Sequence, residues 1–254
     1  MITAGVDLAA EAKRTAVAVV QWSGRDAWLT DLVVGADDEV LLEAAGVADK
    51  VGIDCPLGWS DEFVEFVNAH HTGRVDQMPV DSAMRVPLRY RATDLFLIEQ
   101  QLGRPLSVSS DLIGVCAMRA AGLLAAMTKA GLEVDRSGVS GRVAETYPAA
   151  AVRQWELADG SYKGTTKTAA LGAMVDRLKH GLPQLDLGEH EALCRKSDDA
   201  FDALMCALVA RAITQYRCTI PIPRGLALRA QREGWIHVPN CHLFELLAPA
   251  AFDD

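Results

Sequence analysis

The sequence lacks the paired cysteine and histidine motifs of common metal-binding and disulfide-bonded proteins. Its six cysteines are scattered and form no C-x-x-C pair, and its six histidines include no H-x-x-x-H pair. These spacings argue against a zinc site, a disulfide framework and a histidine-based zinc enzyme. Because several cysteines lie in apolar runs, we expect buried free thiols in a reducing cytoplasm.

Long apolar runs are also lacking. No stretch of about 18 uncharged apolar residues occurs, so we expect no membrane span. The beginning of the chain, "MITAGVDLAAEAKRT", has no basic region and reaches Asp7 early, which is not typical of a signal peptide. The sequence therefore favours a cytoplasmic protein without a membrane partner.

An excess of positive charge is lacking as well. The formal net charge is −9, and the one basic cluster comprises Arg85, Arg89 and Arg91. A protein that coats nucleic acid non-specifically needs clustered Lys and Arg, so this class is disfavoured. A nuclease is not excluded, because its catalytic carboxylates contribute to the negative balance.

The pattern of apolar residues predicts an α/β protein of one domain over residues 1–254, with a partly helical insertion at 72–132. Strands are predicted at 2–7, 14–22 and 27–35 as an antiparallel meander, then at 50–54, at 141–148 and in "REGWIHVP". Helices are predicted at 37–50, 60–70, 92–103, 110–131, 149–157, 167–181 and 200–212.

Two of these strands end in the same way. "AGVDLA" and "VGIDCP" each run into an aspartate, Asp7 or Asp54, that is followed at once by a turn. Aspartate often merely begins a turn. If the two strands are neighbours, however, both carboxylates lie at the carboxyl edge of the sheet, where open α/β sheets bind ligands.

The helix in "KSDDAFDALMCALVARA" carries further acids on a strongly apolar background. Ser197 is a good N-cap, and acids in the first turn favour the helix dipole, which alone would explain Asp198 and Asp199. Asp202 lies beyond the first turn and shares a helix face with Asp199. A buried carboxylate without a partner is costly, so this pair indicates a bound cation.

Three other residues are candidates for the same site. Glu145, in "RVAETYP", is either a site residue or part of the exposed face of an edge strand. Arg91, in "RATD", either pairs with Asp94 or clamps a substrate phosphate, and we favour the clamp because Arg suits bidentate phosphate contact. Lys163, in "SYKGTTK", is either a phosphate contact or an ordinary surface lysine.

The order of these elements resembles the ribonuclease H-like fold, in which the first strand, the fourth strand and a late helix supply the acids. "DAFDALMCAL" resembles the D-x-x-D-A-L helix of Holliday-junction resolvases of the RuvC type. The chain as a whole resembles domain-of-unknown-function family 429, predicted to be RNase H-like nucleases. The matching pieces are "GVDLAAEAKRTAVAVV", "GIDCPLGW", "RYRATD", "AETYP", "SYKGTTKTAALGAMVDRLK", "SDDAFDALMCALVARA" and "EGWIHVP". One departure is Asp54, where resolvases usually carry Glu.

This resemblance implies a two-metal nuclease, whose substrate could be DNA, RNA, a junction or a small phosphodiester. Mg²⁺ and Mn²⁺ prefer carboxylate oxygens and water. We assign Asp7 as the bridging ligand, Asp54 to one ion, and Asp199 with Asp202 to the other. An actin-like ATPase would need a Gly-rich phosphate loop, but "DLAAEAKRT" contains no glycine. A non-catalytic binding protein on the same fold is the remaining alternative.

Overall fold

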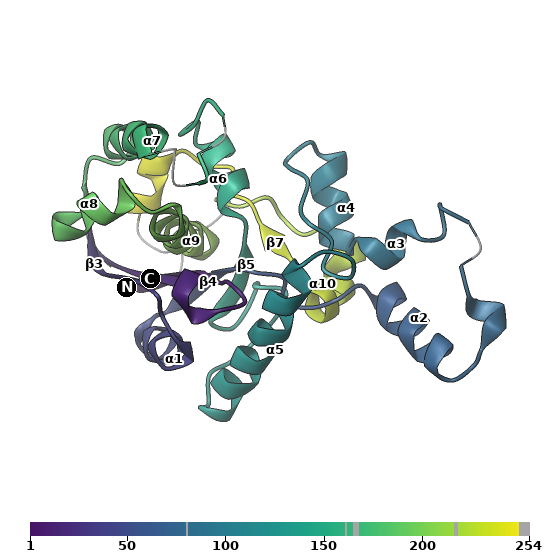
Figure 1. Cartoon of the computed structure of the whole chain (residues 1–254). Helices are drawn as coiled ribbons and strands as arrows, with labels where there is room; N and C mark the ends of the chain where they lie inside the picture. The colour runs from purple at the N-terminus through teal and green to yellow at the C-terminus, as the bar shows by residue number, and fades with distance from the viewer. Residues whose placement is uncertain (80, 161, 165–167, 216–217, 249–254) are drawn as a thin grey trace.

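The protein was analysed as a computed structural model, which describes residues 1–79, 81–160, 162–164, 168–215 and 218–248. A seven-stranded sheet with the strand order β6-β3-β2-β1-β4-β5-β7 forms its centre (Figure 1). The strands are β1 (Ile2–Asp7), β2 (Ala16–Ser23), β3 (Asp26–Val34), β4 (Lys50–Asp54), β5 (Val143–Thr146), β6 (Leu185–Asp186) and β7 (Ile236–His237).

The sheet is mixed. β1, β2 and β3 pair antiparallel, which confirms the predicted meander. β4 lies parallel to β1, β5 to β4 and β7 to β5, while β6 lies parallel to β3. The predicted α/β class with a mixed sheet is therefore confirmed, and it is consistent with a ribonuclease H-like fold. Because β1, β4 and β5 run in one direction, their carboxyl ends lie at the same edge.

The helices of the described residues cover both faces of this sheet or extend away from it. They are α1 (Asp38–Val47), α2 (Asp61–His71), α3 (Val86–Arg89), α4 (Ala92–Glu99), α5 (Ile113–Lys129), α6 (Pro148–Gln154), α7 (Thr168–Gly181), α8 (Glu191–Cys194), α9 (Asp198–Thr214) and α10 (Ala227–Glu233). Short 3₁₀ helices are η1 (Ala12–Arg14), η2 (Val75–Gln77), η3 (Gly188–His190), η4 (Arg224–Leu226) and η5 (Leu243–Leu247). α9 packs on β1, β2 and β4 from one side, α1 and α5 lie on the other, and α2 and α3 extend away from the sheet (Figure 1).

The core follows the alternation of the strands. In β2, Ala18, Val20 and Trp22 contribute to the apolar cluster under α9, whereas Val17 faces the cluster beneath the sheet. Successive side chains of a strand point to opposite faces, so β2 serves both layers. α5, which lies within the predicted insertion, packs against α1 and completes the apolar layer on the face of the sheet opposite α9.

Most element boundaries agree with the sequence to within a few residues. Ser197 caps α9 as predicted, its hydroxyl accepting a hydrogen bond from the backbone N–H of Ala200 at 3.2 Å. The short strand β6 and the short helices α3, α8 and α10 were not predicted. Residue 161 and residues 165–167 of the "SYKGTTK" stretch lie outside the described residues, as does the predicted start of the following helix. Among the residues that the structure describes, no helix is long and apolar enough to cross a membrane.

Candidate metal centre

Two neighbouring strands deliver the first two acids of the site. β1 and β4 pair in parallel with Gly5 opposite Gly52 and Asp7 opposite Asp54. Each aspartate is the last residue of its strand. The two carboxylates therefore leave the sheet side by side at its carboxyl edge.

The glycines of both strands allow α9 to lie directly on the sheet. A Cβ atom on Gly5 would lie 2.0 Å from the carbonyl oxygen of Ala203, and one on Gly52 would lie 2.4 Å from that of Cys206. Both contacts are far shorter than any side chain tolerates. Residues two apart in a strand share a face, so the aspartates that follow the glycines also face α9.

α9 supplies the third acid at this place. Carboxylate oxygens of Asp7, Asp54 and Asp202, one from each residue, all lie within 4.8 Å of one another. Asp202 is only 1% exposed, while Asp7 and Asp54 are partly open to solvent. We call these three residues the acidic cluster. It is closed on the helix side and accessible from the edge of the sheet.

Burial and mutual repulsion make this cluster a poor place for three free carboxylates. Burial, followed by the charges of Asp54 and Asp202, raises the pKa of Asp7 from 3.8 to about 9. Burial raises the pKa of Asp54 to about 7 and also raises the pKa of Asp202. Without a cation, the cluster therefore holds protons at neutral pH that isolated aspartates would release.

The segment before α7 provides the direct partners of Asp202. The hydroxyl of Tyr162 donates a 2.7 Å hydrogen bond to Asp202 Oδ1, and the ammonium of Lys163 lies 2.6 Å from Oδ2. Lys163 was predicted as a phosphate contact or a surface lysine, and its side chain, 53% exposed, forms an ion pair at the site. Sequence reasoning missed Tyr162, although it stands beside Lys163 in "SYKGTTK".

Asp199 lies outside the acidic cluster, contrary to its predicted place beside Asp202. Its carboxylate forms a 2.9 Å ion pair with Arg14, from the connection between β1 and β2. Three residues of an α-helix turn through about 300°, so side chains at i and i+3 diverge by about 60°. That divergence turns Asp199 toward Arg14, a partner that the sequence analysis did not identify.

Arg91 does not fit the predicted role of substrate clamp. Its guanidinium is 1% exposed and forms ion pairs with Asp94 at 2.9 Å and Glu145 at 2.7 Å. The alternative of an internal ion pair therefore describes Arg91. Of the basic cluster noted in the sequence, only Arg85 and Arg89 are exposed.

Glu145 is buried in the same network. Its strand, β5, lies between β4 and β7, so the edge-strand alternative is wrong. Glu145 Oε2 accepts hydrogen bonds from Arg91 at 2.7 Å and from the backbone N–H of Leu57 at 3.1 Å. Because Leu57 follows Asp54 by three residues, this network fixes the turn that leaves the acidic cluster. Glu145 is therefore not one of the three members of the cluster; it holds the turn that follows Asp54.

A buried glutamate that the sequence analysis missed completes the network. Glu233, the last residue of α10, is 0% exposed and accepts hydrogen bonds from the backbone N–H groups of Asp61 and Ala92. Its own backbone carbonyl accepts a 3.1 Å hydrogen bond from Arg91. The starts of α2 and α4 are thereby held together. Glu233 stands in the quoted "REGWIHVP" motif, which was the available signal.

The residues of the acidic cluster fit a divalent cation. Three carboxylates and the Lys163 ammonium leave two formal negative charges when all are ionised. Asp202 Oδ2 forms no well-aligned hydrogen bond among the described residues despite its short ion pair. Oxygen-only donors suit Mg²⁺ and Mn²⁺ better than zinc. Asp7, Asp54 and Asp202 are the residues that would hold such an ion.

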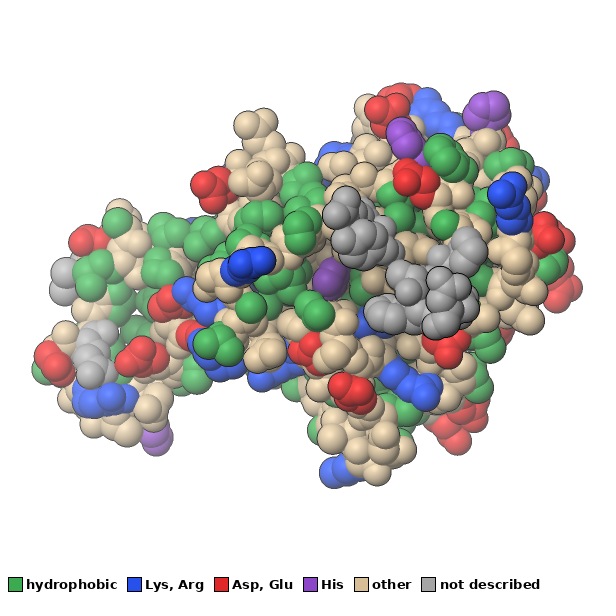
Figure 2. All heavy atoms as spheres, turned by 180° about the vertical axis from the view of Figure 1, so that it is seen from behind, with side chains coloured by type: hydrophobic (Ala, Val, Ile, Leu, Met, Phe, Trp, Pro, Cys, Tyr) green, Lys and Arg blue, Asp and Glu red, His purple; other side chains and the backbone are tan. Residues whose placement is uncertain are grey.

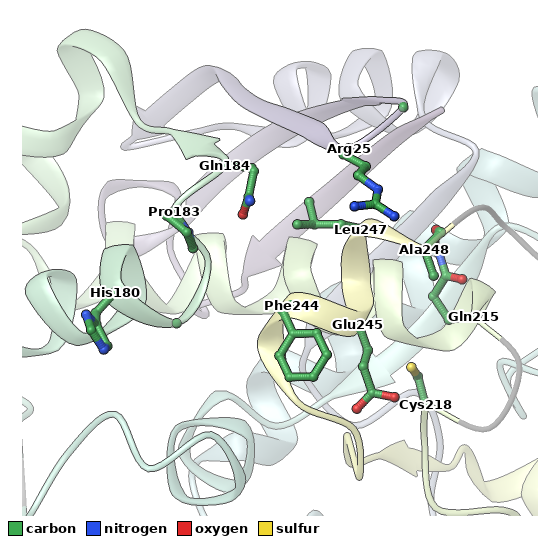
Figure 3. A pocket seen from close by; sticks show the side chains of 12 residues that line it. Arg25, His180, Pro183, Gln184, Gln215, Cys218, Phe244, Glu245, Leu247 and Ala248 are labelled. Atoms are coloured by element: carbon green, nitrogen blue, oxygen red, sulfur yellow. Dashed lines mark hydrogen bonds between the residues drawn. The ribbon is translucent and has the colours of Figure 1, made fainter.

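A cavity of about 990 Å³ lies elsewhere on the molecule. It is lined by the β2–β3 hairpin residues Gly24 and Arg25, the end of α7, and η5 (Figure 3). The hairpin tip lies beyond the start of β1, at the opposite edge from Asp7. None of the acidic cluster lines this cavity, so size alone does not locate the candidate site.

Comparison with known proteins identifies one related group. The sequence model of a family described as protein of unknown function (DUF429) matches residues 5–225. This range contains the whole acidic cluster together with Lys163 and Glu145. No curated protein and no solved structure shows a significant match to the chain.

Proposed function

The chain belongs to the DUF429 family, and we propose that it is a Mg²⁺- or Mn²⁺-dependent nuclease that hydrolyses phosphodiester bonds. The observation that carries this proposal is the convergence of Asp7, Asp54 and Asp202 at the open edge of a mixed sheet. The resemblance of the element order to the ribonuclease H-like fold supports the same conclusion. Nucleases of that fold use acids from the corresponding strands and helix.

Each residue of the site has a definite task in this proposal. Asp7, Asp54 and Asp202 would hold the cation, and a bound cation would supply activation of a water molecule and neutralisation of charge on the phosphate. Tyr162 fixes the orientation of Asp202 through its 2.7 Å hydrogen bond. Lys163, half exposed beside the cluster, provides positive charge where a phosphate would approach.

The cation arrangement proposed here is simpler than the sequence predicted. A second ion held by Asp199 and Asp202 would require the Asp199 carboxylate, whose Oδ1 is paired with Arg14 and which is not among the converging acids. We therefore assign one ion to the acidic cluster.

DNA or RNA is the proposed substrate, engaged near the site and not along a long basic surface. Acidic and basic side chains are interspersed over the face shown in Figure 2, and the net charge is −9. Binding that depends on many phosphate contacts needs clustered Lys and Arg. We place the activity in the reducing cytoplasm, and the six free cysteines support this.

Nucleotide binding of the actin-like type is less well supported. The connection after β1 contains no glycine, as the sequence shows. Gly58, after β4, is packed against α10, where an added Cβ would lie 2.7 Å from the carbonyl oxygen of Arg232. The backbone there is covered by protein and does not form a phosphate loop.

A cleavage assay with Mn²⁺ tests the proposal. Branched, single-stranded and RNA–DNA hybrid substrates are offered to the wild type, to Asp7→Asn, and to Asp31→Asn as a control at an exposed position of β3. We expect cleavage by the wild type and the control and none by Asp7→Asn. Equal cleavage by all three would refute the proposal, and metal binding without any cleavage would favour a non-catalytic binding protein.

A further inference from the structure

Three consecutive residues fasten the segment 162–164 to the first turns of α9. Tyr162 and Lys163 contact the two oxygens of Asp202, and the backbone N–H of Gly164 donates a 2.9 Å hydrogen bond to Asp198 Oδ2. The segment therefore lies over the acidic cluster in a defined position. Lys163 is the cation that this position brings to the acids.

The Lys163 ammonium occupies a place that a metal ion would also favour. It lies 2.6 Å from Asp202 Oδ2. Burial lowers the pKa of Lys163, but the charges of Asp202, Asp54 and Asp7 together raise it above its usual value, so the ammonium lies in the combined field of the whole cluster. Asp202 is almost fully buried, so the ammonium supplies the stabilisation that water would give to an exposed carboxylate.

A metal ion that binds Asp202 must share or take an oxygen already engaged by Tyr162 or Lys163. Tyr162 is only 5% exposed, and its ring packs edge-on against Phe201 in the core under α9. Its hydroxyl is therefore held in place. The side chain of Lys163 is 53% exposed, so it is the partner that is free to move away.

We propose that Lys163 is a tethered counterion, which neutralises Asp202 in the ion-free protein and is displaced from it when a divalent cation binds the acidic cluster. This inference rests on the proposed metal site. The displaced ammonium has space to enter, because Lys163 also lines a cavity of about 510 Å³ together with Tyr162 and Arg153.

Calorimetric titration with Mn²⁺ alone tests the proposal without any cleavage assay. The proteins are the wild type, Lys163→Gln, and Arg14→Gln as the matched control. Arg14 is also a cation near the acids, but it pairs with Asp199 outside the acidic cluster. The melting temperature of each ion-free protein is measured in chelator, and circular dichroism verifies the fold.

The expected result is a pair of opposite changes in Lys163→Gln. Mn²⁺ should bind it about tenfold more tightly than the wild type, equivalent to about 1.4 kcal/mol, because no ammonium has to be displaced. Its ion-free form should melt at a lower temperature, because the buried Asp202 loses its counter charge. Arg14→Gln should change the Mn²⁺ affinity by less than about threefold, since general electrostatics at an exposed pair is weak.

Two outcomes would overturn this inference and leave the nuclease proposal standing. One is equal Mn²⁺ affinity of the wild type and Lys163→Gln, and the other is an equal gain in Lys163→Gln and Arg14→Gln. If neither the wild type nor Lys163→Gln bound Mn²⁺, both proposals would fail together. Binding by Lys163→Gln alone would support the tethered counterion most directly.

Discussion

Replacement of Asp7 by Asn should stabilise the ion-free protein, although it removes a proposed metal ligand. Asp7 has no ion-pair partner among the described residues, whereas Asp202 is paired with Lys163. Asp54 is not ion-paired among these residues either, but its pKa is raised only to about 7, whereas that of Asp7 is raised to about 9, so Asp7 is the least compensated acid of the cluster. An amide of the same shape removes its charge without removing its packing.

The size of the effect follows from the raised pKa. The pKa of Asp7 rises from 3.8 in the unfolded chain to about 9, so at pH 7 the folded protein must keep a proton that the unfolded chain releases. At about 1.36 kcal/mol per pH unit, this costs roughly 4 kcal/mol at pH 7 as an upper limit. Allowing for imperfect hydrogen bonding of the amide, we expect a gain of about 2 kcal/mol, or roughly 4–8 °C in melting temperature.

The pH dependence of this gain has a definite sign. A folded-state pKa above the unfolded value gives a contribution to stability that is complete below pH 3.8 and is lost as the pH rises to about 9. The difference between Asp7→Asn and the wild type should therefore be small near pH 4 and grow up to about pH 9. Urea unfolding in chelator at four pH values measures it.

Two further measurements make the result decisive. Asp31→Asn, at an exposed position of β3, should show no growing difference over the same range. Mn²⁺ should raise the melting temperature of the wild type by mass action and leave that of Asp7→Asn nearly unchanged. A pH-independent difference, or a destabilised ion-free Asp7→Asn, would refute the reasoning from buried charge.

Three other predictions concern the surroundings of the site. Arg91→Leu should lower the free energy of unfolding by about 3–5 kcal/mol, because it leaves the buried carboxylates of Asp94 and Glu145 without their counter charge. Urea unfolding measures this loss, and a loss below about 1 kcal/mol would contradict the buried network. Gly5→Ala should lower the free energy of unfolding by about 3 kcal/mol and abolish Mn²⁺ binding, because the added Cβ forces α9 away from the sheet. The control is Gly46→Ala, whose Cβ meets nothing within 4 Å and which should be neutral or stabilising. His237 is buried, its Nε2 lies 2.8 Å from the carbonyl oxygen of Ser137, and burial lowers its pKa from 6.5 to about 4. The neutral imidazole therefore contributes stability above pH 6.5 that is lost as the pH falls toward 4. The free energy of unfolding of His237→Gln should lack this loss, and a pH profile identical to that of the wild type would contradict the prediction.

The strands of the site were predictable because their pattern is local. "AGVDLA" and "VGIDCP" show both the strand and its end, and short connections indicate the meander. Parallel pairing then follows from the order of elements. The role of Gly5 and Gly52 could not be predicted, because it is the close approach of α9 that excludes a side chain at these two positions.

The side-chain partners were harder to predict because they come from distant segments. Arg91 meets Glu145 across 54 residues, and Arg14 meets Asp199 across 185. No local periodicity encodes such pairs. The sequence identified Arg91, Glu145 and Asp199 as notable charges, but only the fold decides which of them face one another and which face solvent.

The cost of the acidic cluster is itself an argument for a ligand. Burial raises the pKa of Asp7, Asp54 and Asp202, so keeping these acids ionised at this place costs stability. Tyr162 and Lys163 offset part of the repulsion at Asp202 by direct contact, whereas Asp7 forms no ion pair with any described residue. Local conflicts with stability are expected at functional sites, where a ligand compensates them. A divalent cation matches the two uncompensated negative charges, whereas a purely structural role would be served equally well by asparagine at both strand ends.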